Sequence, residues 1–281
     1  MRRSRVRRGW LGRLLAGLLL AALLILTVGP VVWVGLSSLK GTREIIASPP
    51  SLIPGEVTLQ HYSRLLTTTD FARQLRNSLA IAISTMALTT VIVTCAALGA
   101  YRGHAYWLRN LKFVAILAFV FPTTLLVVPI YEVLSWLNLI DSLASIILVN
   151  TMLTAPFAFW LIEGFLDAVP KEIEEAATVD GASRWSIYTR VILPLITPGL
   201  GTIAVYTFVT AWTEFTFSSI LLIDRSLKTL PLGLADILAQ YNIDWGLLTS
   251  NTTLAMVPGI IFFAFAGRYF VRGLVTGALK T

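Results

Sequence analysis

The 281-residue sequence is poor in charged side chains. Asp, Glu, Lys and Arg make up 13% of it, whereas soluble domains carry roughly 25%. Hydrophobic residues account for 56% and the mean hydropathy is +0.77, which excludes an ordinary soluble domain. Cysteine is nearly absent: Cys95 stands alone inside an apolar stretch, so the chain offers no disulfide and no cysteine-based metal site. The composition therefore predicts a membrane protein.

A phosphate-binding loop is missing as well. A P-loop, G-x-x-x-x-G-K-[ST], wraps phosphates with backbone N–H groups and needs a lysine directly after a glycine. None of the five lysines follows a glycine, so we expect no ATP site of this kind. His61 and His104 lie outside the apolar runs and give no indication of a metal site.

Apolar runs long enough to cross a membrane recur along the sequence. A helix needs about 20 residues to cross a hydrocarbon core about 30 Å thick. Barrel strands need only about ten, so these runs must satisfy their backbone groups as helices. Six runs qualify: Arg13 to Ser38, Ser78 to Tyr101, Phe113 to Trp136, Ser142 to Phe165, Pro198 to Ile223 and Thr252 to Phe270. The sequence predicts an all-α polytopic membrane protein with six transmembrane helices in one domain, residues 1–281.

The basic residues indicate the orientation in the membrane. With the N-terminus inside, the inner segments hold 15 of the 22 Lys and Arg residues and the outer segments hold 7, in agreement with the positive-inside rule. The inner set is Arg2, Arg3, Arg5, Arg7, Arg8, Arg13, Arg102, Arg109, Lys112, Lys171, Arg184, Arg190, Arg268, Arg272 and Lys280. We therefore expect both termini in the cytoplasm. These residues form no stripe with stacking aromatics, so the net charge of +7 does not indicate nucleic-acid binding.

The first and the outer segments allow simpler predictions. The first apolar run follows a basic start, as in a secretory signal, but it is too long and no A-x-A-like cleavage site follows. We expect an uncleaved helix. The outer segment Lys40 to Asn77, with the proline-rich "SPPSLIPG", is either a connector or a docking element, and Leu137 to Asp141 is expected to be a tight turn without a functional role.

The inner segment of residues 168–197 has the pattern of a helical hairpin. "VPKEIEEAA" places a proline and then acids at a helix start, where they favour the positive end of the helix dipole. Asp180 and Gly181 supply a stop, because glycine readily adopts the left-handed conformation that ends helices. A second helix is expected to begin near Ser183, whose hydroxyl can cap it, and to run until Pro194. Its apolar face would contain Trp185, Tyr188 and Ile192, at i, i+3 and i+7.

Two explanations compete for this hairpin. It can lie as an amphipathic element under the lipid headgroups, or it can dock a cytoplasmic partner. Glu172, Glu174, Glu175 and Asp180 disfavour the first, because the cytoplasmic leaflet is itself negatively charged. Small residues beside the turn favour the second, since they allow close backbone approach.

The hairpin also carries a recognisable signature. The pattern E-A-A, three residues, G, nine residues and I-x-L-P resembles the EAA motif in the permease subunits of bacterial ABC importers, with Val191 in place of the isoleucine. The stretches "SLKGTREI", "AWTEF", "KTLPLGLA", "DWG" and "RYFVRGLVTGALK" resemble the MalG-type, carbohydrate-uptake branch. In that branch asparagine is usual at Thr213 and glycine at Thr281.

The resemblance implies the type I ABC importer permease fold and a division of labour. A homologous second permease would complete the path, an extracytoplasmic binding protein would deliver the solute, and a dimer of ATPase subunits would bind ATP and magnesium, leaving this chain without a cofactor or catalytic site. The hairpin would couple the chain to the ATPase. The coupling residues it implies are Glu174, Glu175, Ala176, Ala177, Asp180, Gly181, Val191, Leu193 and Pro194. The chain would lie in the cytoplasmic membrane of a bacterium.

Polar residues inside the apolar runs suggest where a solute would pass. Such residues are costly in a membrane and usually face a cavity or the protein interior. Trp212 and Glu214 form the first candidate pair, because sugars suit aromatic faces beside hydrogen-bonding groups. Asn150, Thr151 and Thr154 in the fourth run, and Glu132 in the third, are further candidates. An equally good explanation for Glu214 is a hydrogen bond that holds the permease pair together.

Other functions remain open at this point. An ion-driven secondary transporter usually shows internal repeats, and we find no convincing repeat. A membrane-anchored signalling or assembly protein is a second alternative. Among importers, a di- or oligosaccharide is the leading solute, followed by glycerol 3-phosphate or a glycerophosphodiester.

Overall fold

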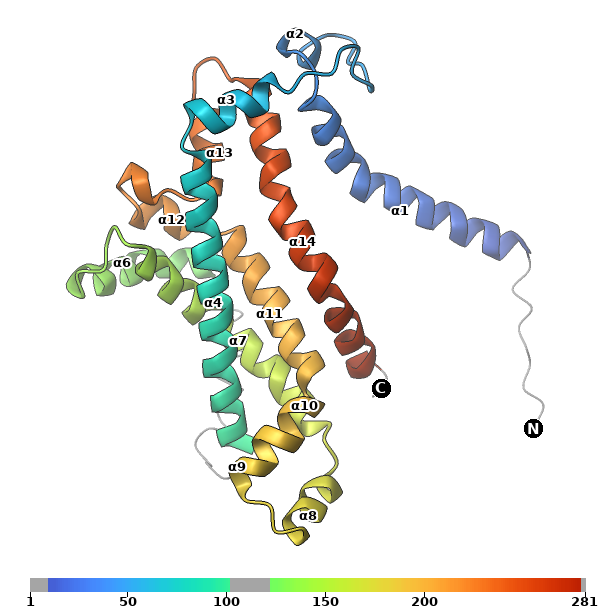
Figure 1. Cartoon of the computed structure of the whole chain (residues 1–281), viewed down its shortest axis with the longest axis vertical. Helices are drawn as coiled ribbons and strands as arrows, with labels where there is room; N and C mark the ends of the chain where they lie inside the picture. The colour runs from blue at the N-terminus through green and yellow to red at the C-terminus, as the bar shows by residue number, and fades with distance from the viewer. Residues whose placement is uncertain (1–9, 102–121, 279–281) are drawn as a thin grey trace. The chain divides into compact units, whose positions relative to one another are not determined.

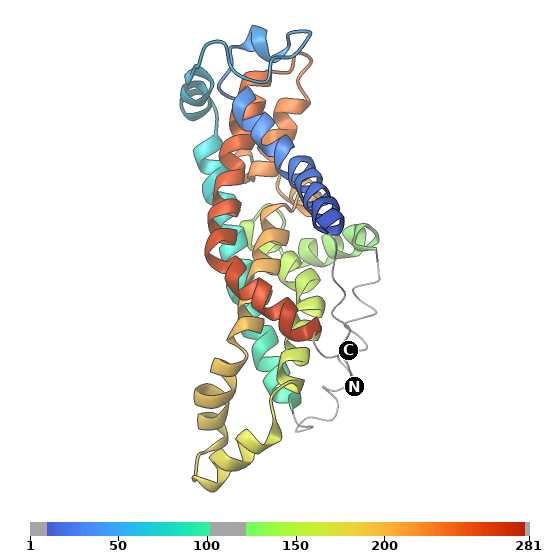
Figure 2. The same ribbon diagram turned by 90° about the vertical axis from the view of Figure 1, so that its right-hand side faces the viewer.

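The computed structural model describes residues 10–101 and 122–278, and every regular element in these ranges is helical. The chain divides into two compact units, residues 1–69 with 237–254 and residues 70–236 with 255–281. Figures 1 and 2 show the helices in two views. The prediction of an all-α protein is therefore confirmed for the described residues.

The larger unit is built on three long helices that pack against one another. They are α4 (Phe71–Ala100), α7 (Leu143–Asp167) and α11 (Thr197–Trp212). Gly199 on α11 permits a close approach, since a Cβ there would lie 2.6 Å from the Phe165 ring on α7. The remaining elements assigned wholly to this unit are η3 (Thr123–Leu126), α6 (Val127–Trp136), α8 (Lys171–Val179), α9 (Arg184–Ile187), the π-helical segment η4 (Tyr188–Ile192), α10 (Leu193–Leu195), α12 (Thr216–Leu221) and η5 (Arg225–Leu227).

The smaller unit contains α1 (Trp10–Ser37), α2 (Thr42–Ile45) and α3 (Gln60–Thr68). Lys40 is buried there, and its ammonium donates a hydrogen bond to the Ser51 carbonyl at 2.5 Å and lies 4.8 Å from the Trp33 ring centroid. Burial raises the pKa of Asp244, but a hydrogen bond from the Leu247 N–H and the Arg64 guanidinium outweigh this effect and lower the pKa. The contacts of Lys40 and Arg64 thus hold the segment between α1 and α4 in a defined conformation. The last two helices are α13 (Leu230–Leu238) and α14 (Trp245–Ala278).

The membrane-spanning helices agree in part with the six predicted runs. Among the described residues, four helices are long and apolar enough to cross a membrane: Gly12–Ser37, Phe71–Ala100, Leu143–Asp167 and Trp245–Phe265. A fifth is possible if Arg184–Leu195 and Thr197–Trp212, which meet at a 69° bend, form one span. For the predicted run Phe113 to Trp136, residues 113–121 lie outside the described part, and the rest forms η3 and α6.

The prediction of an unbroken span from Pro198 to Ile223 is wrong. α11 ends at Trp212, and a new helix, α12, begins at Thr216. The Glu214 carboxylate accepts hydrogen bonds from the N–H groups of Phe217 and Ser218, at 2.6 and 3.0 Å. A carboxylate that satisfies the first turn of a helix stabilises a helix start at that point, and hydropathy alone does not reveal such a start.

Candidate functional site: the hairpin of α8 and α9

The first helix of the hairpin ends in a defined cap. Gly181 has φ +80°, the left-handed conformation that glycine adopts at little cost. The Ala182 N–H donates to the Ala177 carbonyl and the Gly181 N–H to the Thr178 carbonyl, each at 3.0 Å. This pair of bonds is a Schellman motif, which satisfies carbonyls left free at a helix end. The predicted stop at Asp180 and Gly181 is confirmed.

The second helix begins where predicted, and Tyr188 and Ile192 of its predicted apolar face pack against the core. The Ser183 hydroxyl accepts a hydrogen bond from the Ser186 N–H at 3.3 Å, so Ser183 is the N-cap. Ile187 and Ile192 are buried, whereas the Trp185 side chain is 77% exposed. Trp185 was predicted on the apolar face, which is wrong, because η4 widens the helix and places residues five apart on the same side.

The hairpin packs onto one end of the long helices of its unit. A hydrophobic cluster joins Ile187 and Ile192 to Ala97 on α4, Ile162 on α7 and Ile203 on α11. Ala177 and Leu193 of the EAA signature pack against this cluster. In Figures 1 and 2 the hairpin lies beyond the end of α4 at which the chain reaches Ala100. The hairpin is thus a rigid extension of the helical core.

Other signature residues face outward. Glu175, Ala176, Asp180, Gly181 and Pro194 are exposed, Glu174 and Val191 are half-buried, and the neighbouring Val179 is 88% exposed. The signature therefore divides into residues that attach the hairpin to the core and residues that present a surface.

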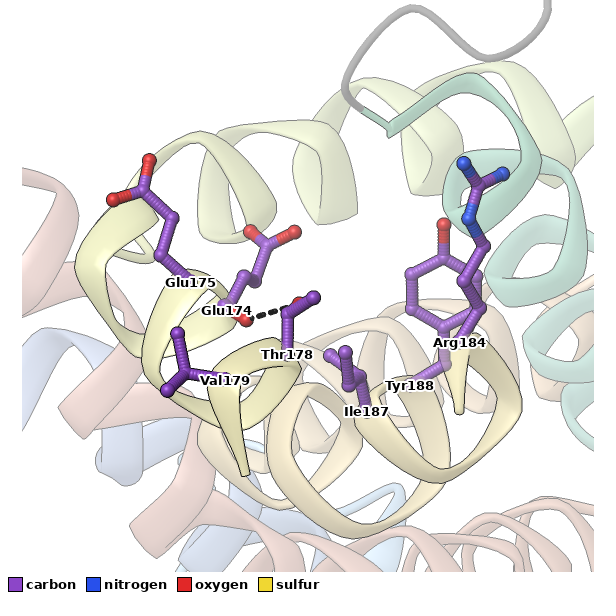
Figure 3. Close-up of a pocket in the computed structure, with 7 residues that line it drawn as sticks. All are labelled: Glu174, Glu175, Thr178, Val179, Arg184, Ile187 and Tyr188. Carbon is purple, nitrogen blue, oxygen red and sulfur yellow. Dashed lines mark hydrogen bonds between the residues drawn. The ribbon is translucent and has the colours of Figure 1, made fainter. Parts of the chain in front are cut away.

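A groove of about 540 Å³ opens between the two hairpin helices. Its walls are formed by Glu174, Glu175, Thr178, Val179, Arg184, Ile187 and Tyr188. Figure 3 shows that the Glu174 and Glu175 side chains leave α8 in different directions, although they are adjacent in sequence. The groove combines two acidic side chains, one arginine and apolar side chains.

A tyrosine that the sequence analysis treated only as the end of a span also touches the hairpin. Tyr101, directly after α4, donates a hydrogen bond from its hydroxyl to Glu174 Oε1 at 2.5 Å. The available signal was an aromatic residue at the end of an apolar run, which is common to many membrane helices.

Of the six residues predicted for a solute path, Glu132 is exposed on α6 and Thr151 is buried on α7. The other four lie in two separate places. Asn150 and Thr154 are buried on α7, where the Thr154 hydroxyl donates to the Asn150 carbonyl at 2.7 Å and lies 3.3 Å from the Thr89 hydroxyl on α4. Trp212 stacks on Phe208 with ring centroids 5.8 Å apart, and Glu214 caps α12. In the described part of the chain, no hydrogen bond joins the two pairs.

The described residues were also compared with the arrangement that a metal site requires. Within residues 10–101 and 122–278, no group of three or more His, Cys, Asp and Glu side chains is arranged to hold an ion.

Long apolar helices define a polytopic α-helical membrane protein, and a capped hairpin extends from the core of its larger unit. The model of the family described as "Binding-protein-dependent transport system inner membrane component" matches residues 92–276. The chain belongs to this family, and it is an inner-membrane component of such a transport system.

Individual relatives and solved structures agree with this assignment. The diacetylchitobiose uptake system permease protein DasC of Streptomyces coelicolor is 30% identical over 98% of the chain and 100% of its own length. The trehalose/maltose transport system permease protein MalG of Thermococcus litoralis is 30% identical over 95% of the chain and 96% of its own length. A chain of a bacterial ABC transporter involved in alginate import has the same fold, with a TM-score of 0.78 at 19% identity over 96% of this chain and 99% of that one.

Proposed function

We propose that this chain is one of two membrane-spanning subunits of an ATP-driven importer for a sugar or a sugar-like solute. A homologous permease completes the translocation path, and an extracytoplasmic binding protein delivers the solute. ATP and magnesium bind to a pair of ATPase subunits, not to this chain. The names of the relatives, which refer to diacetylchitobiose and to trehalose or maltose, support a di- or oligosaccharide.

The observation that carries the proposal is the surface of the α8–α9 hairpin. Its turn is fixed by a Schellman motif, its base is buried in the core of the larger unit, and its exposed side includes Val179 and Trp185. Large apolar side chains on the surface of a rigid hairpin are costly in water and are typical of a docking site. We assign this side to the ATPase, with Glu174, Glu175, Ala176, Ala177, Asp180, Gly181, Val191, Leu193 and Pro194 as the coupling residues.

Closure of the ATPase dimer on ATP would move the hairpin. Because the hairpin packs against α4, α7 and α11 through one hydrophobic cluster, the movement would carry these helices with it. Close-packed interfaces of this kind transmit displacement instead of absorbing it. The result is alternating access, in which the energy comes from a partner and this chain supplies the moving wall.

For the solute path, we favour the residues at the break after α11 over the residues on α7. Thr154 contacts Thr89 on α4, and the Asn150 side chain is hydrogen-bonded within α7. Trp212, in contrast, is half-buried, and Glu214 lies where the helix is interrupted. Interrupted membrane helices are found where the backbone lines a cavity.

Substitution of Gly181 by Trp tests the coupling surface. We expect the variant to insert and assemble but to lose solute-stimulated ATP hydrolysis in proteoliposomes. Any side chain at φ +80° strains the turn, and an indole there would obstruct the proposed docking surface. Gly17→Trp is the control, since a Cβ at Gly17 on α1 meets no atom within 4 Å. Stimulation at the wild-type level in Gly181→Trp would refute the assignment.

A further inference from the structure

A hydrogen bond joins the end of α4 to the start of the hairpin. The Tyr101 hydroxyl donates to Glu174 Oε1 at 2.5 Å, across 73 positions of sequence. Tyr101 is the first residue after α4, and Glu174 lies in the first turn of α8. The contact therefore connects a membrane-spanning helix directly to the helix that carries the EAA signature.

The environment of Tyr101 holds its hydroxyl in place. The side chain is 5% exposed and belongs to the hydrophobic cluster that also contains Val169, Ile187 and Ile192. Burial of the ring leaves the hydroxyl few alternative positions, and a hydrogen bond to a carboxylate is roughly twice as strong as one between neutral groups. Tyr101 and Glu174 thus act as a fixed link and not as a chance surface contact.

The two adjacent acids of α8 differ in what they reach. Glu174 is half-buried and meets Tyr101, whereas Glu175, the acid of the E-A-A pattern, is exposed. Figure 3 shows the two side chains leaving α8 in different directions. Glu174 thus reaches the end of α4, whereas Glu175 is exposed on the hairpin.

We propose that the Tyr101–Glu174 hydrogen bond is a positioning contact that couples movement of α8 to α4. The inference rests on the proposed function, because it assigns a role within the coupling hairpin. The hydrophobic cluster holds the second half of the hairpin through the buried Ile187 and Ile192, whereas α8 has no buried residue and contributes the half-buried Ala177. A directional hydrogen bond fixes the register of α8 against α4, so that displacement of the hairpin moves the span.

The test is a double-mutant cycle on the complete reconstituted complex. Tyr101→Phe removes the hydroxyl and keeps the buried ring, and Glu174→Ala removes the acceptor. For each variant, solute uptake per ATP hydrolysed and thermal stability are measured in proteoliposomes. We expect each single variant to lower uptake per ATP about tenfold, with the double variant no worse than either one, because both remove the same contact.

Two further variants serve as controls. Glu174→Gln keeps an acceptor oxygen and is expected to retain more coupling than Glu174→Ala. Tyr131→Phe, on an exposed part of α6, is expected to match the wild type.

Two outcomes would overturn the proposal. The first is either wild-type uptake per ATP in Tyr101→Phe, or losses in the two single variants that add in the double variant. The second is loss of complex assembly in Tyr101→Phe, which would make the contact one of stability. A wild-type complex without ATP-driven uptake would instead refute the proposed function, so the two failures are distinguishable.

Discussion

Gly199 is a position at which the packing of α11 against α7 leaves no room for a side chain. It is buried on α11, and a Cβ would lie 2.6 and 2.7 Å from two carbons of the Phe165 ring and 3.2 Å from the Ile162 side chain. Phe165 also packs against the cluster that holds the hairpin. The space at this position is therefore part of the connection between α7 and α11.

Substitution of Gly199 by Leu is expected to destabilise the protein by about 1–3 kcal/mol, the usual cost of overpacking a core. The measurement is the Tm of the purified complex. Gly164→Leu is a matched control, because Gly164 lies on α7 and a Cβ there meets no atom within 4 Å. Equal Tm values for the two variants would show that α11 can shift away from α7 without cost.

Glu214 has more than one candidate role. From the sequence, a carboxylate in an apolar run indicated either a solute contact or a hydrogen bond between permeases. The structure adds a local role, since Glu214 accepts hydrogen bonds from the N–H groups of Phe217 and Ser218 and from the Ser218 hydroxyl. The solute role stays a prediction, and a carboxylate already engaged in three bonds has less capacity for a sugar hydroxyl.

At the scale of elements, the turn of residues 137–141 is more than a connector. Asp141 Oδ1 accepts hydrogen bonds from the N–H groups of Ile223 and Asp224, both at 2.8 Å, and the Asp141 N–H donates to the Leu221 carbonyl at 2.9 Å. The turn thus clamps the segment after α12. The sequence did not predict this structural role, because the partners lie 80 to 83 residues away. The expectation that the turn has no functional role stays a prediction.

Asp141→Ala is expected to release this clamp and to speed amide hydrogen exchange at Ile223 and Asp224 by about three- to tenfold. Both residues are exposed, so the expected loss is that of a net hydrogen bond, about 0.5–1.5 kcal/mol. Asp141→Asn should restore protection, because its amide oxygen accepts the same bonds and Asn tolerates φ +59°.

Asn138→Ala is the control for backbone strain alone, as Asn138 also has a positive φ of 56°. Equal exchange rates in Asp141→Ala and the wild type would contradict the clamp.

The hairpin shows which features of an element were accessible from sequence. Its start, its stop at Asp180 and Gly181 and its cap at Ser183 depend on residues within a few positions, so they were predicted correctly. The orientation of Trp185 was not, since the π-helical segment places Ile187 and Ile192 on the packed face. Ile187 and Ile192 face the core because they pack against α4, α7 and α11, and the local sequence does not specify how these helices pack.

At the scale of the whole molecule, the distribution of Lys and Arg makes a prediction about the two sides of the membrane. Lys and Arg are concentrated in the segments that we predict on the cytoplasmic side, together with the hairpin and both termini. The segment between α13 and α14, with Tyr241 at 101% relative exposure, is predicted on the opposite side. Cys95 is the only native thiol.

Labelling of single cysteines checks this topology. In a Cys95→Ser background, Tyr241→Cys is expected to react with an impermeant maleimide in cells with a permeabilised outer layer. Val179→Cys, also highly exposed, is expected to react only after the cytoplasmic membrane is opened. Expression without the ATPase keeps the hairpin accessible. Reaction of both thiols from the same side would contradict the predicted orientation.

The sequence alone determined that this chain crosses a membrane by helices, that its hairpin has two capped helices, and that it resembles importer permeases. These properties follow from hydropathy, from capping and from spacing, which act over a few turns of helix. Only the tertiary structure decided that the fifth run breaks at Thr213, that Asp141 clamps residues 221–224, and that Tyr101 meets Glu174. The last two depend on groups between 73 and 83 positions apart, and no local pattern specifies which partners the packing of helices brings together.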